Sequence, residues 1–125
     1  MISCTILPLP YSCYKTKSIA IDQRWHEFRC CISHISSDSF SVLAPTGSLK
    51  EYTDEQPGWT GLVINNTLDF SISGFLHSFL EPFARNKISV LVISEFDTDC
   101  VFFPTKTLDK VKAFLQESNI LVADA

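Results

Sequence analysis

Residues 57–104, PGWTGLVINNTLDFSISGFLHSFLEPFARNKISVLVISEFDTDCVFFP, decide the fold of this 125-residue chain. Apolar runs at 60–66, 88–94 and 101–103 each predict a strand. Between the first two runs, apolar residues recur at the 3.6-residue spacing of an amphipathic helix. They are Ile72, Phe75, Leu76, Phe79, Leu80 and Phe83. Pro82 predicts a kink or an early end of this helix near Glu81, with Asn86 as a left-handed residue after it.

The residues beyond this stretch add a second helix and a closing strand. Thr105 or Thr107 is expected to cap a helix, and residues 120–122 to form the strand. The buried side of that helix is expected to carry Leu108, Val111, Phe114 and Leu115. From residue 60 the predicted order is therefore β, α, β, β, α, β, an α+β arrangement of the ferredoxin-like kind.

The N-terminal half is predicted to be rich in β-structure. We expect strands at 2–7 and 11–17, and an antiparallel hairpin formed by 28–35 and 40–44. Residues 48–57 are polar, and Gln56-Pro57-Gly58 marks the expected boundary. The chain is thus predicted to hold a β-rich module at 1–56 and a second domain at 57–125, with antiparallel sheets and Trp59 anchoring the linker.

Composition excludes several classes of function. The net charge of −4, without a cluster of basic residues, argues against binding of nucleic acid or anionic membranes. No apolar run approaches the ~18 residues of a membrane span, and the N-terminus lacks the features of a secretory signal. Five cysteines without a CxxC pair predict free thiols, and hence a cytoplasmic protein. The three histidines have no metal-ligand spacing, so neither metal nor cofactor is expected.

Two polar clusters are predicted to face one small-molecule site. The first is Asp69-Phe70-Ser71 with Gly74, at the start of the first helix. Unpaired backbone N–H groups and the positive end of the helix dipole favour a carboxylate there. Gly74, in the first turn, would allow close approach of a ligand.

The second cluster is Ser94-Glu95-Phe96-Asp97-Thr98-Asp99. Its carboxylates suit an ammonium group, and Phe96 would supply an apolar wall. Simpler interpretations stay open for both clusters. Asp69 and Ser71 would serve only as helix caps, and Gly74 would only let the helix lie close to a strand. The acidic loop would be a solvated hairpin turn, and Phe96 an ordinary core residue.

The motifs of the C-terminal half resemble the ACT domain family, closest to the modules of aspartokinases and of the CASTOR arginine sensors. The resemblance is carried by Gly58-Trp59, Leu68-Asp69-Phe70-Ser71, Gly74, Pro82, Ile88-Ser89-Val90, Ser94, Phe96, Asp97-Thr98-Asp99, Pro104 and Leu108. The N-terminal half resembles the shortened, degenerate ACT-like module of small stand-alone members.

The resemblance implies an amino-acid-binding regulatory fold, assembled by side-by-side pairing of ACT units. By motif, ligand contacts would come from Gly74, Glu95, Phe96 and Asp99. Glu95 departs from the family pattern, which usually has threonine there. A carboxylate at this position would favour a cationic ligand or repel the carboxylate of an ordinary amino acid.

The sequence therefore predicts a non-catalytic sensor of a small molecule, an amino acid, working as a homodimer. The alternative is a protein-interaction or assembly module with a vestigial site, suggested by the two-sided apolar strands at 88–94 and 101–103. An enzyme is not expected. Candidate acid–base pairs such as Glu95 with Asp99 exist, and His77 lies on the first helix, beside the solvent side of its apolar stripe. No nucleophile–base constellation or phosphate-binding glycine loop occurs.

Overall fold

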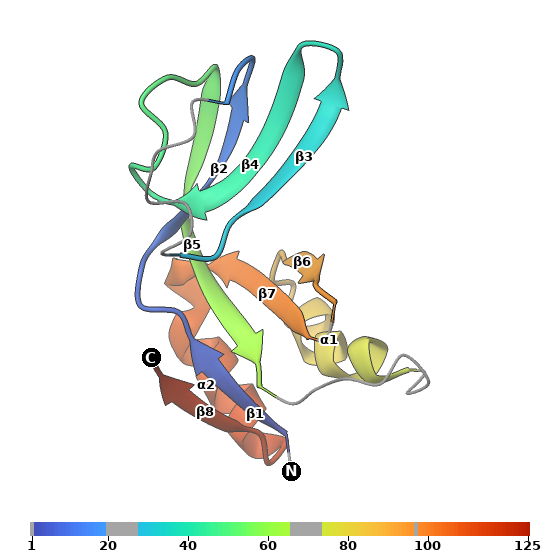
Figure 1. Ribbon diagram of the computed structural model, residues 1–125. Helices are drawn as coiled ribbons and strands as arrows, with labels where there is room; N and C mark the ends of the chain where they lie inside the picture. The colour runs from blue at the N-terminus through green and yellow to red at the C-terminus, as the bar shows by residue number, and fades with distance from the viewer. Residues whose placement is uncertain (1, 20–27, 66–73, 97) are drawn as a thin grey trace. The chain divides into compact units, whose positions relative to one another are not determined.

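The computed structural model describes residues 2–19, 28–65, 74–96 and 98–125, and the chain folds as two compact units (Figure 1). Residues Leu9–Trp59 form one unit, here called the β unit. Residues Met1–Pro8 and Thr60–Ala125 together form the other, here called the helical unit. The β unit is therefore inserted in the sequence of the helical unit.

The β unit is an antiparallel sheet of four strands. It contains β2 (Tyr11–Thr16), β3 (Cys31–Ser36), β4 (Ser39–Pro45) and the first part of β5 (Asp54–Ile64), in the order β3-β4-β2-β5. The predicted hairpin is confirmed as β3 and β4. One face of the sheet buries a small apolar cluster, which includes Tyr14, Val42, Ala44 and Leu49.

The predicted Pro57-Gly58 boundary lies inside β5 rather than in a linker. Tyr11 pairs with Trp59 and Cys13 with Gln56, so the register shifts at Pro57 and Gly58. Gly58 has a φ of +87°, a conformation that glycine adopts readily in a β-bulge. Proline, which donates no ladder hydrogen bond, is tolerated at the same irregularity. Turn-forming residues here bend a strand and do not end it.

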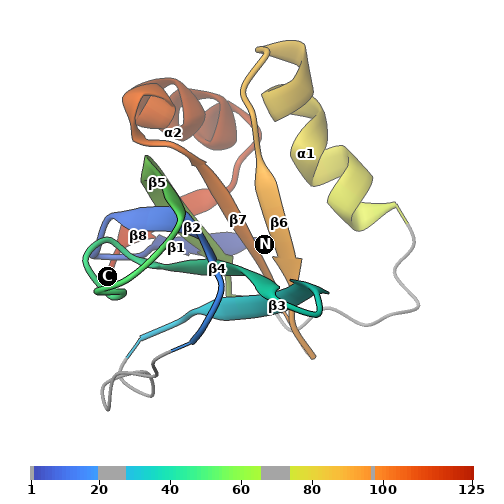
Figure 2. The same cartoon turned by 90° about the horizontal axis from the view of Figure 1, so that it is seen from above.

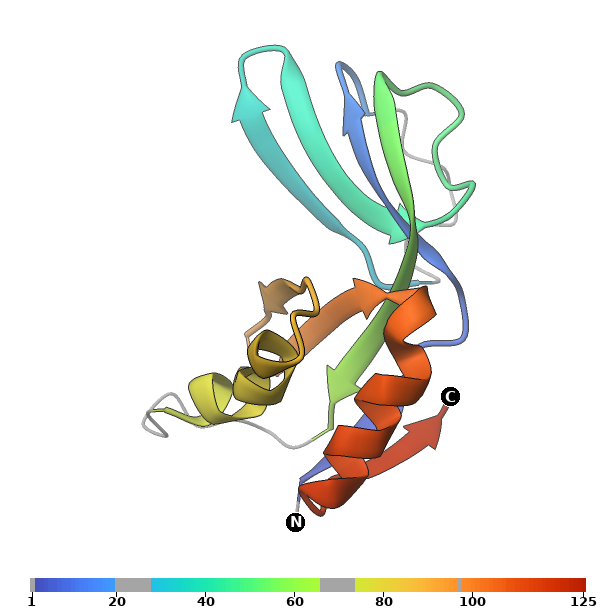
Figure 3. The same cartoon turned by 180° about the vertical axis from the view of Figure 1, so that it is seen from behind.

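The helical unit has a five-stranded sheet with two helices on one face (Figures 2 and 3). Its strands are β1 (Ser3–Ile6), the second part of β5, β6 (Leu91–Ser94), β7 (Asp99–Pro104) and β8 (Leu121–Asp124), in the order β6-β7-β5-β1-β8. The helices are α1 (Phe75–Arg85) and α2 (Leu108–Glu117), the latter preceded by a 3-10 turn, η2 (Thr105–Thr107).

The first strand occupies a central place in the helical unit. β1 pairs antiparallel with β5, with Cys4 opposite Ile64, and parallel with β8, with Ser3 opposite Leu121. The predicted ferredoxin-like α+β fold is confirmed, with β1 as an additional strand between β5 and β8. The sequence predicts antiparallel sheets only, and the parallel pairing of β1 with β8 differs from that prediction. The division at residues 56 and 57 stays a prediction, whereas the compact units meet within β5.

The two helices are held on the sheet by one apolar core. Phe83 lies at its centre, with its ring 4.9 Å from that of Phe114 in an edge-to-face arrangement and 6.0 Å from that of Phe103. Each such side chain contributes about 1.5–3 kcal/mol when it is buried. Val111, Phe114 and Leu115 are buried, as predicted for the second helix.

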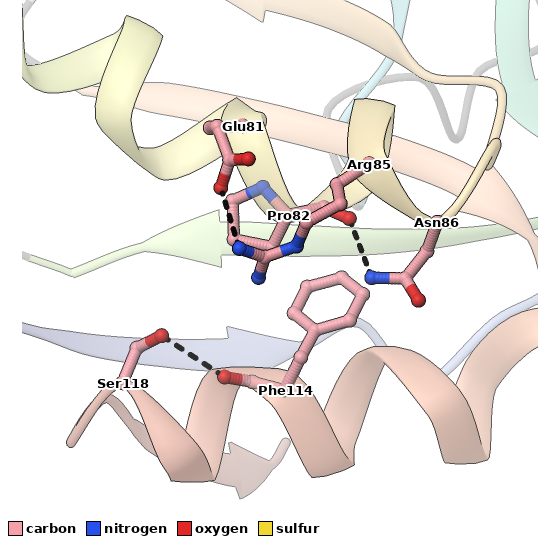
Figure 4. Close-up of polar contacts among 6 residues, drawn as sticks. All are labelled: Glu81, Pro82, Arg85, Asn86, Phe114 and Ser118. Carbon is pink, nitrogen blue, oxygen red and sulfur yellow. Dashed lines mark hydrogen bonds and ion pairs between the residues drawn. The ribbon is translucent and has the colours of Figure 1, made fainter.

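The first helix runs through Pro82 and does not stop near Glu81. It continues to Arg85, and Asn86 is not left-handed, with a φ of −91°. The side-chain amide of Asn86 donates to the carbonyl of Pro82 at 2.7 Å (Figure 4). The left-handed residue is Lys87, with a φ of 59°, and Ile88 N–H donates to Phe83 C=O. This is the Schellman pattern, and α2 repeats it with Asn119 and Ile120.

Replacing Lys87 with glycine is predicted to stabilise the protein by roughly 0.5–1 kcal/mol. The left-handed conformation costs a residue with a Cβ about 1–2 kcal/mol, which exceeds the extra unfolded-state entropy of glycine. Asn119→Gly is the matched control at the end of α2, and a smaller gain is expected because asparagine tolerates this conformation. Urea unfolding of the two variants measures both effects, and a destabilised Lys87→Gly would contradict the assignment.

On the face of the sheet opposite the helices, the side chains of Leu7 and Phe102 pack closely over Gly61. A Cβ at residue 61 would lie 2.6 Å from Leu7 Cδ1 and 2.6 Å from Phe102 Cε2. Real Cβ atoms do not approach other carbons so closely. Glycine is therefore needed here for space and not for its backbone angles.

We predict that Gly61→Ala destabilises the protein by about 1–3 kcal/mol, the usual cost of overpacking. Leu7→Ala removes one of the two clashing groups, so the double variant should be more stable than the sum of the single effects predicts. A double-mutant cycle by urea unfolding tests this. Strict additivity of the two changes would show that Leu7 does not lie over residue 61.

Candidate functional site

The start of α1 is the first part of the predicted site. Gly74 is the N-cap of this helix, one residue before Phe75, and has a φ of +82°. It therefore does not lie in the first helical turn, where the sequence pattern places it. A Cβ at this position would meet no atom within 4 Å, so glycine is not needed for close packing on a strand. Its left-handed conformation is the physical reason for glycine here.

Among the described residues, no side chain caps the start of α1. Gly74 makes no side-chain capping hydrogen bond, and the first turn contains no acidic residue. The positive end of the helix dipole is therefore not offset by a carboxylate of its own first turn. Asp69, Phe70 and Ser71, the other predicted members of this cluster, lie outside the described residues.

The loop between β6 and β7 is the second part. Ser94 pairs with Asp99 at the ends of the two strands, and Glu95 N–H donates to Thr98 C=O at 2.8 Å. The hydroxyl of Thr98 donates to the carbonyl of Ile64, the last residue of β5. The loop is thus fastened to the end of β5 and is not only a self-contained solvated turn.

Phe96 is not a core residue, because 88% of its surface is exposed. The tight turn from Glu95 to Thr98 leaves this aromatic side chain in solvent. Single exposed apolar side chains are common on protein surfaces, so the exposure of Phe96 makes it accessible to a ligand without marking a site by itself.

Glu95 has a partner that the sequence pattern did not suggest. Its carboxylate oxygen Oε1 accepts a hydrogen bond from the thiol of Cys100, with a sulfur–oxygen distance of 3.2 Å. Cys100 is buried in β7, whereas Glu95 is exposed. The residue that departs from the family pattern is therefore held by a buried thiol, and only the three-dimensional pairing of β6 with β7 reveals this contact.

A network of hydrogen-bonded side chains lies in the β unit, and the sequence alone did not predict it. The hydroxyl of Ser12, fully buried, donates to Glu55 Oε2 at 2.7 Å and lies 2.8 Å from the hydroxyl of Thr46. A side-chain hydrogen bond with Glu55 raises the pKa of Tyr52. Serine and threonine in strands give no signal of such a network, because their partners are 34 and 43 residues away.

Neither a cluster of metal-ligating side chains nor a membrane-spanning helix occurs among the described residues. Within residues 2–19, 28–65, 74–96 and 98–125, no cluster of three histidine, cysteine, aspartate or glutamate side chains is suited to a metal ion. None of the helices in these segments is both long and apolar enough to cross a membrane.

Comparison with known families identifies the fold as that of an ACT domain. The sequence model of the ACT domain family matches residues 54–117, just over half of the chain. The chain therefore belongs to the ACT domain family, whose members are regulatory, ligand-binding modules and not catalytic ones. No curated protein matched the chain.

Solved structures share this fold at low sequence identity. A protein of Agobacterium tumefaciens is 22% identical, with a TM-score of 0.82, over 99% of this chain and 93% of the other. A Vibrio cholerae protein described as of unknown function and a possible transport protein is 12% identical, with a TM-score of 0.66, over 93% and 88%. The Clostridium acetobutylicum aspartate kinase is 9% identical, with a TM-score of 0.57, over 89% of this chain and 32% of the kinase.

The five thiols are predicted to differ strongly in reactivity. Burial raises the pKa of Cys4 to about 11, and Cys100 is buried against Glu95. At pH 8 a thiol with a pKa of about 11 is ionised in about one molecule in a thousand. Burial and the neighbouring Cys31 also raise the pKa of Cys30, but its thiol is exposed to solvent. Brief treatment of the native protein with iodoacetamide should therefore modify Cys30 before Cys4 and Cys100, the two buried thiols.

Peptide mass spectrometry at several reaction times measures this order, and the same treatment in urea is the control, in which all five thiols should react. Equal rates for Cys4 and Cys30 in the native protein would contradict the burial described above.

Proposed function

We propose that this ACT protein binds an amino acid in a non-catalytic, regulatory role, with the ligand held between the start of α1 and the β6–β7 loop. The observation that carries the proposal is the match of the ACT family to residues 54–117, which include both segments. The ligand-binding residues would be Asp69, Phe70, Ser71, Gly74, Ser94, Glu95, Phe96 and Asp99.

The topology supports a single site for the two segments. The β6–β7 loop is bonded to Ile64 at the end of β5, and α1 is the next helix along the chain after β5. In a strand–helix–strand unit of the ferredoxin-like kind, the helix begins near the end of the sheet at which the preceding strand stops. Gly74 and the loop would then lie at one end of the sheet.

The chemistry of the two segments complements an amino acid. The first-turn N–H groups of α1, for which Gly74 supplies no capping side chain, would receive the α-carboxylate. Glu95 and Asp99 would receive the α-ammonium group or a basic side chain. A carboxylate accepts several hydrogen bonds, so the contact of Glu95 with Cys100 leaves it competent for this role. Phe96 would close over the apolar part of the ligand.

In this proposal the protein is cytoplasmic and works as a homodimer through sheet or helix pairing. A second candidate is an assembly module whose ligand site is vestigial. It is favoured by β6, which pairs with β7 alone among the described strands and presents partly exposed Leu91 and Ile93. Light scattering combined with a binding measurement tests the second candidate, because a strict monomer that nevertheless binds a ligand would exclude the assembly module.

Thermal unfolding in the presence of each of the 20 amino acids tests the proposed function. A ligand at ten times its Kd stabilises the native protein by about 1.4 kcal/mol, so the Tm should rise by several degrees. In the double variant Glu95→Gln with Asp99→Asn, the shift should largely disappear. Glu117→Gln, which neutralises an exposed carboxylate at the end of α2, is the matched control and should keep it.

Failure of every amino acid at 10 mM to raise the Tm would refute the proposal. A shift that survives in the double variant would place the ligand elsewhere.

A further inference from the structure

A pocket of about 200 Å³ lies in the β unit, apart from the segments of the proposed amino-acid site. Its walls are apolar, and its polar part is a short turn. It is lined by Leu9, Pro10, Phe28, Pro45, Thr46, Gly47 and Ser48. One water needs only about 10–15 Å³ of such space, so the pocket admits a small organic molecule.

The turn that forms the polar part is well defined. Ser48 N–H donates to Pro45 C=O at 3.0 Å, and Gly47 has a φ of +90°. This is the type II arrangement, in which the third residue needs a positive φ. The turn therefore presents Thr46 and Ser48 in a fixed orientation.

Every backbone donor of the turn has a partner within the fold. Thr46 N–H donates to Pro10 C=O at 2.9 Å, and Gly47 N–H donates to the hydroxyl of Tyr14 at 2.8 Å. Ser48 N–H is used by the turn itself. None of these N–H groups is left to receive an anion.

The hydroxyl protons of the turn are also committed. Ser48 O–H donates to Pro45 C=O at 2.5 Å. Ser12 has one hydroxyl proton and gives it to Glu55, because a carboxylate only accepts. In the 2.8 Å contact between Ser12 and Thr46 the proton must therefore come from Thr46. The hydrogen bonds therefore run from Thr46 to Ser12 and from Ser12 to Glu55, and the carboxylate of Glu55, which can only accept, sets this direction.

What remains for a ligand is a set of acceptors. The oxygens of Thr46 and Ser48 keep lone pairs, and the chain ending on Glu55 makes the Thr46 oxygen more electron-rich by polarisation. Phe28 adds an aromatic wall, which attracts cations. A pocket with acceptors, an aromatic ring and apolar walls suits a cationic donor with a short hydrocarbon body.

We propose that this pocket is a second small-molecule site, which binds a primary alkylammonium ion. The ammonium group donates to the hydroxyl oxygens of Thr46 and Ser48, and the alkyl chain contacts Leu9, Phe28 and Pro45. A carboxylate is rejected because the turn offers it no donor. The site differs in this respect from the proposed amino-acid site, where the helix N-terminus of α1 offers N–H groups to a carboxylate.

Titration of the ¹⁵N-labelled full chain with n-butylammonium chloride, followed by NMR, tests the site. Amide signals of Phe28, Thr46, Gly47 and Ser48 should shift in a saturable way at millimolar concentrations. Sodium butyrate and n-butanol, of the same length, are the anionic and neutral comparisons. Butyrate should give no saturable shift at these residues, and butanol at least tenfold weaker binding.

Thr46→Val keeps the shape of the side chain and removes the hydroxyl oxygen, so it should weaken butylammonium binding at least tenfold. Thr105→Val is the matched control, since Thr105 forms a similar hydroxyl pair with Thr60 at 2.8 Å in the helical unit. It should leave the binding unchanged.

If Thr46→Val does not fold, Leu9→Arg replaces it. Leu9 is 45% exposed on the pocket wall, and a guanidinium there should repel the ammonium ion without disturbing the hydroxyl chain. The proposal is overturned if butylammonium gives no saturable shift at the turn, if butyrate binds equally well, or if the variant used retains full affinity.

Discussion

The pairing of β5 with different partners along its length is the constraint on which the rest of this structure depends. Its first residues pair with β2 in the β unit, and its last residues pair with β1 in the helical unit. The register shift at Pro57 and Gly58 lies within the pairing with β2, shortly before the residues that pair with β1. Because β1 and β5 flank the β unit in the sequence and pair with each other, the helical unit cannot complete its sheet until both ends of the insertion are in place.

The sequence predicts where the helices and strands of this fold lie better than it predicts which strands pair with each other. Apolar periodicity located both helices and the strands of the C-terminal half, because burial of one helix face and of central strands is a local pattern. Nothing in residues 2–7 shows that they pair with β5 and β8, since that choice is made by residues about 60 and 120 positions away. Likewise, Pro57-Gly58 has the composition of a linker, and only the register shows a bulge.

The candidate site, like the fold, could be predicted from the sequence only in part. Gly74 and the acidic loop were found from composition, because glycine and clustered carboxylates stand out in an apolar stretch. The N-cap position of Gly74, the exposure of Phe96 and the thiol contact of Glu95 follow from backbone geometry and from β6–β7 pairing. The hydroxyl chain from Thr46 to Glu55 joins three strands or turns of the β unit and has no local sequence pattern at all.

The most direct measurement of the central proposal is an NMR map of the amino-acid site. The ¹⁵N-labelled protein would be titrated with the amino acid that raises the Tm most. The account predicts that the largest amide shifts fall at Phe75–His77, at the start of α1, and at Glu95, Phe96 and Thr98 in the β6–β7 loop. Saturable shifts confined to other parts of the chain, with both of these segments unchanged, would contradict it.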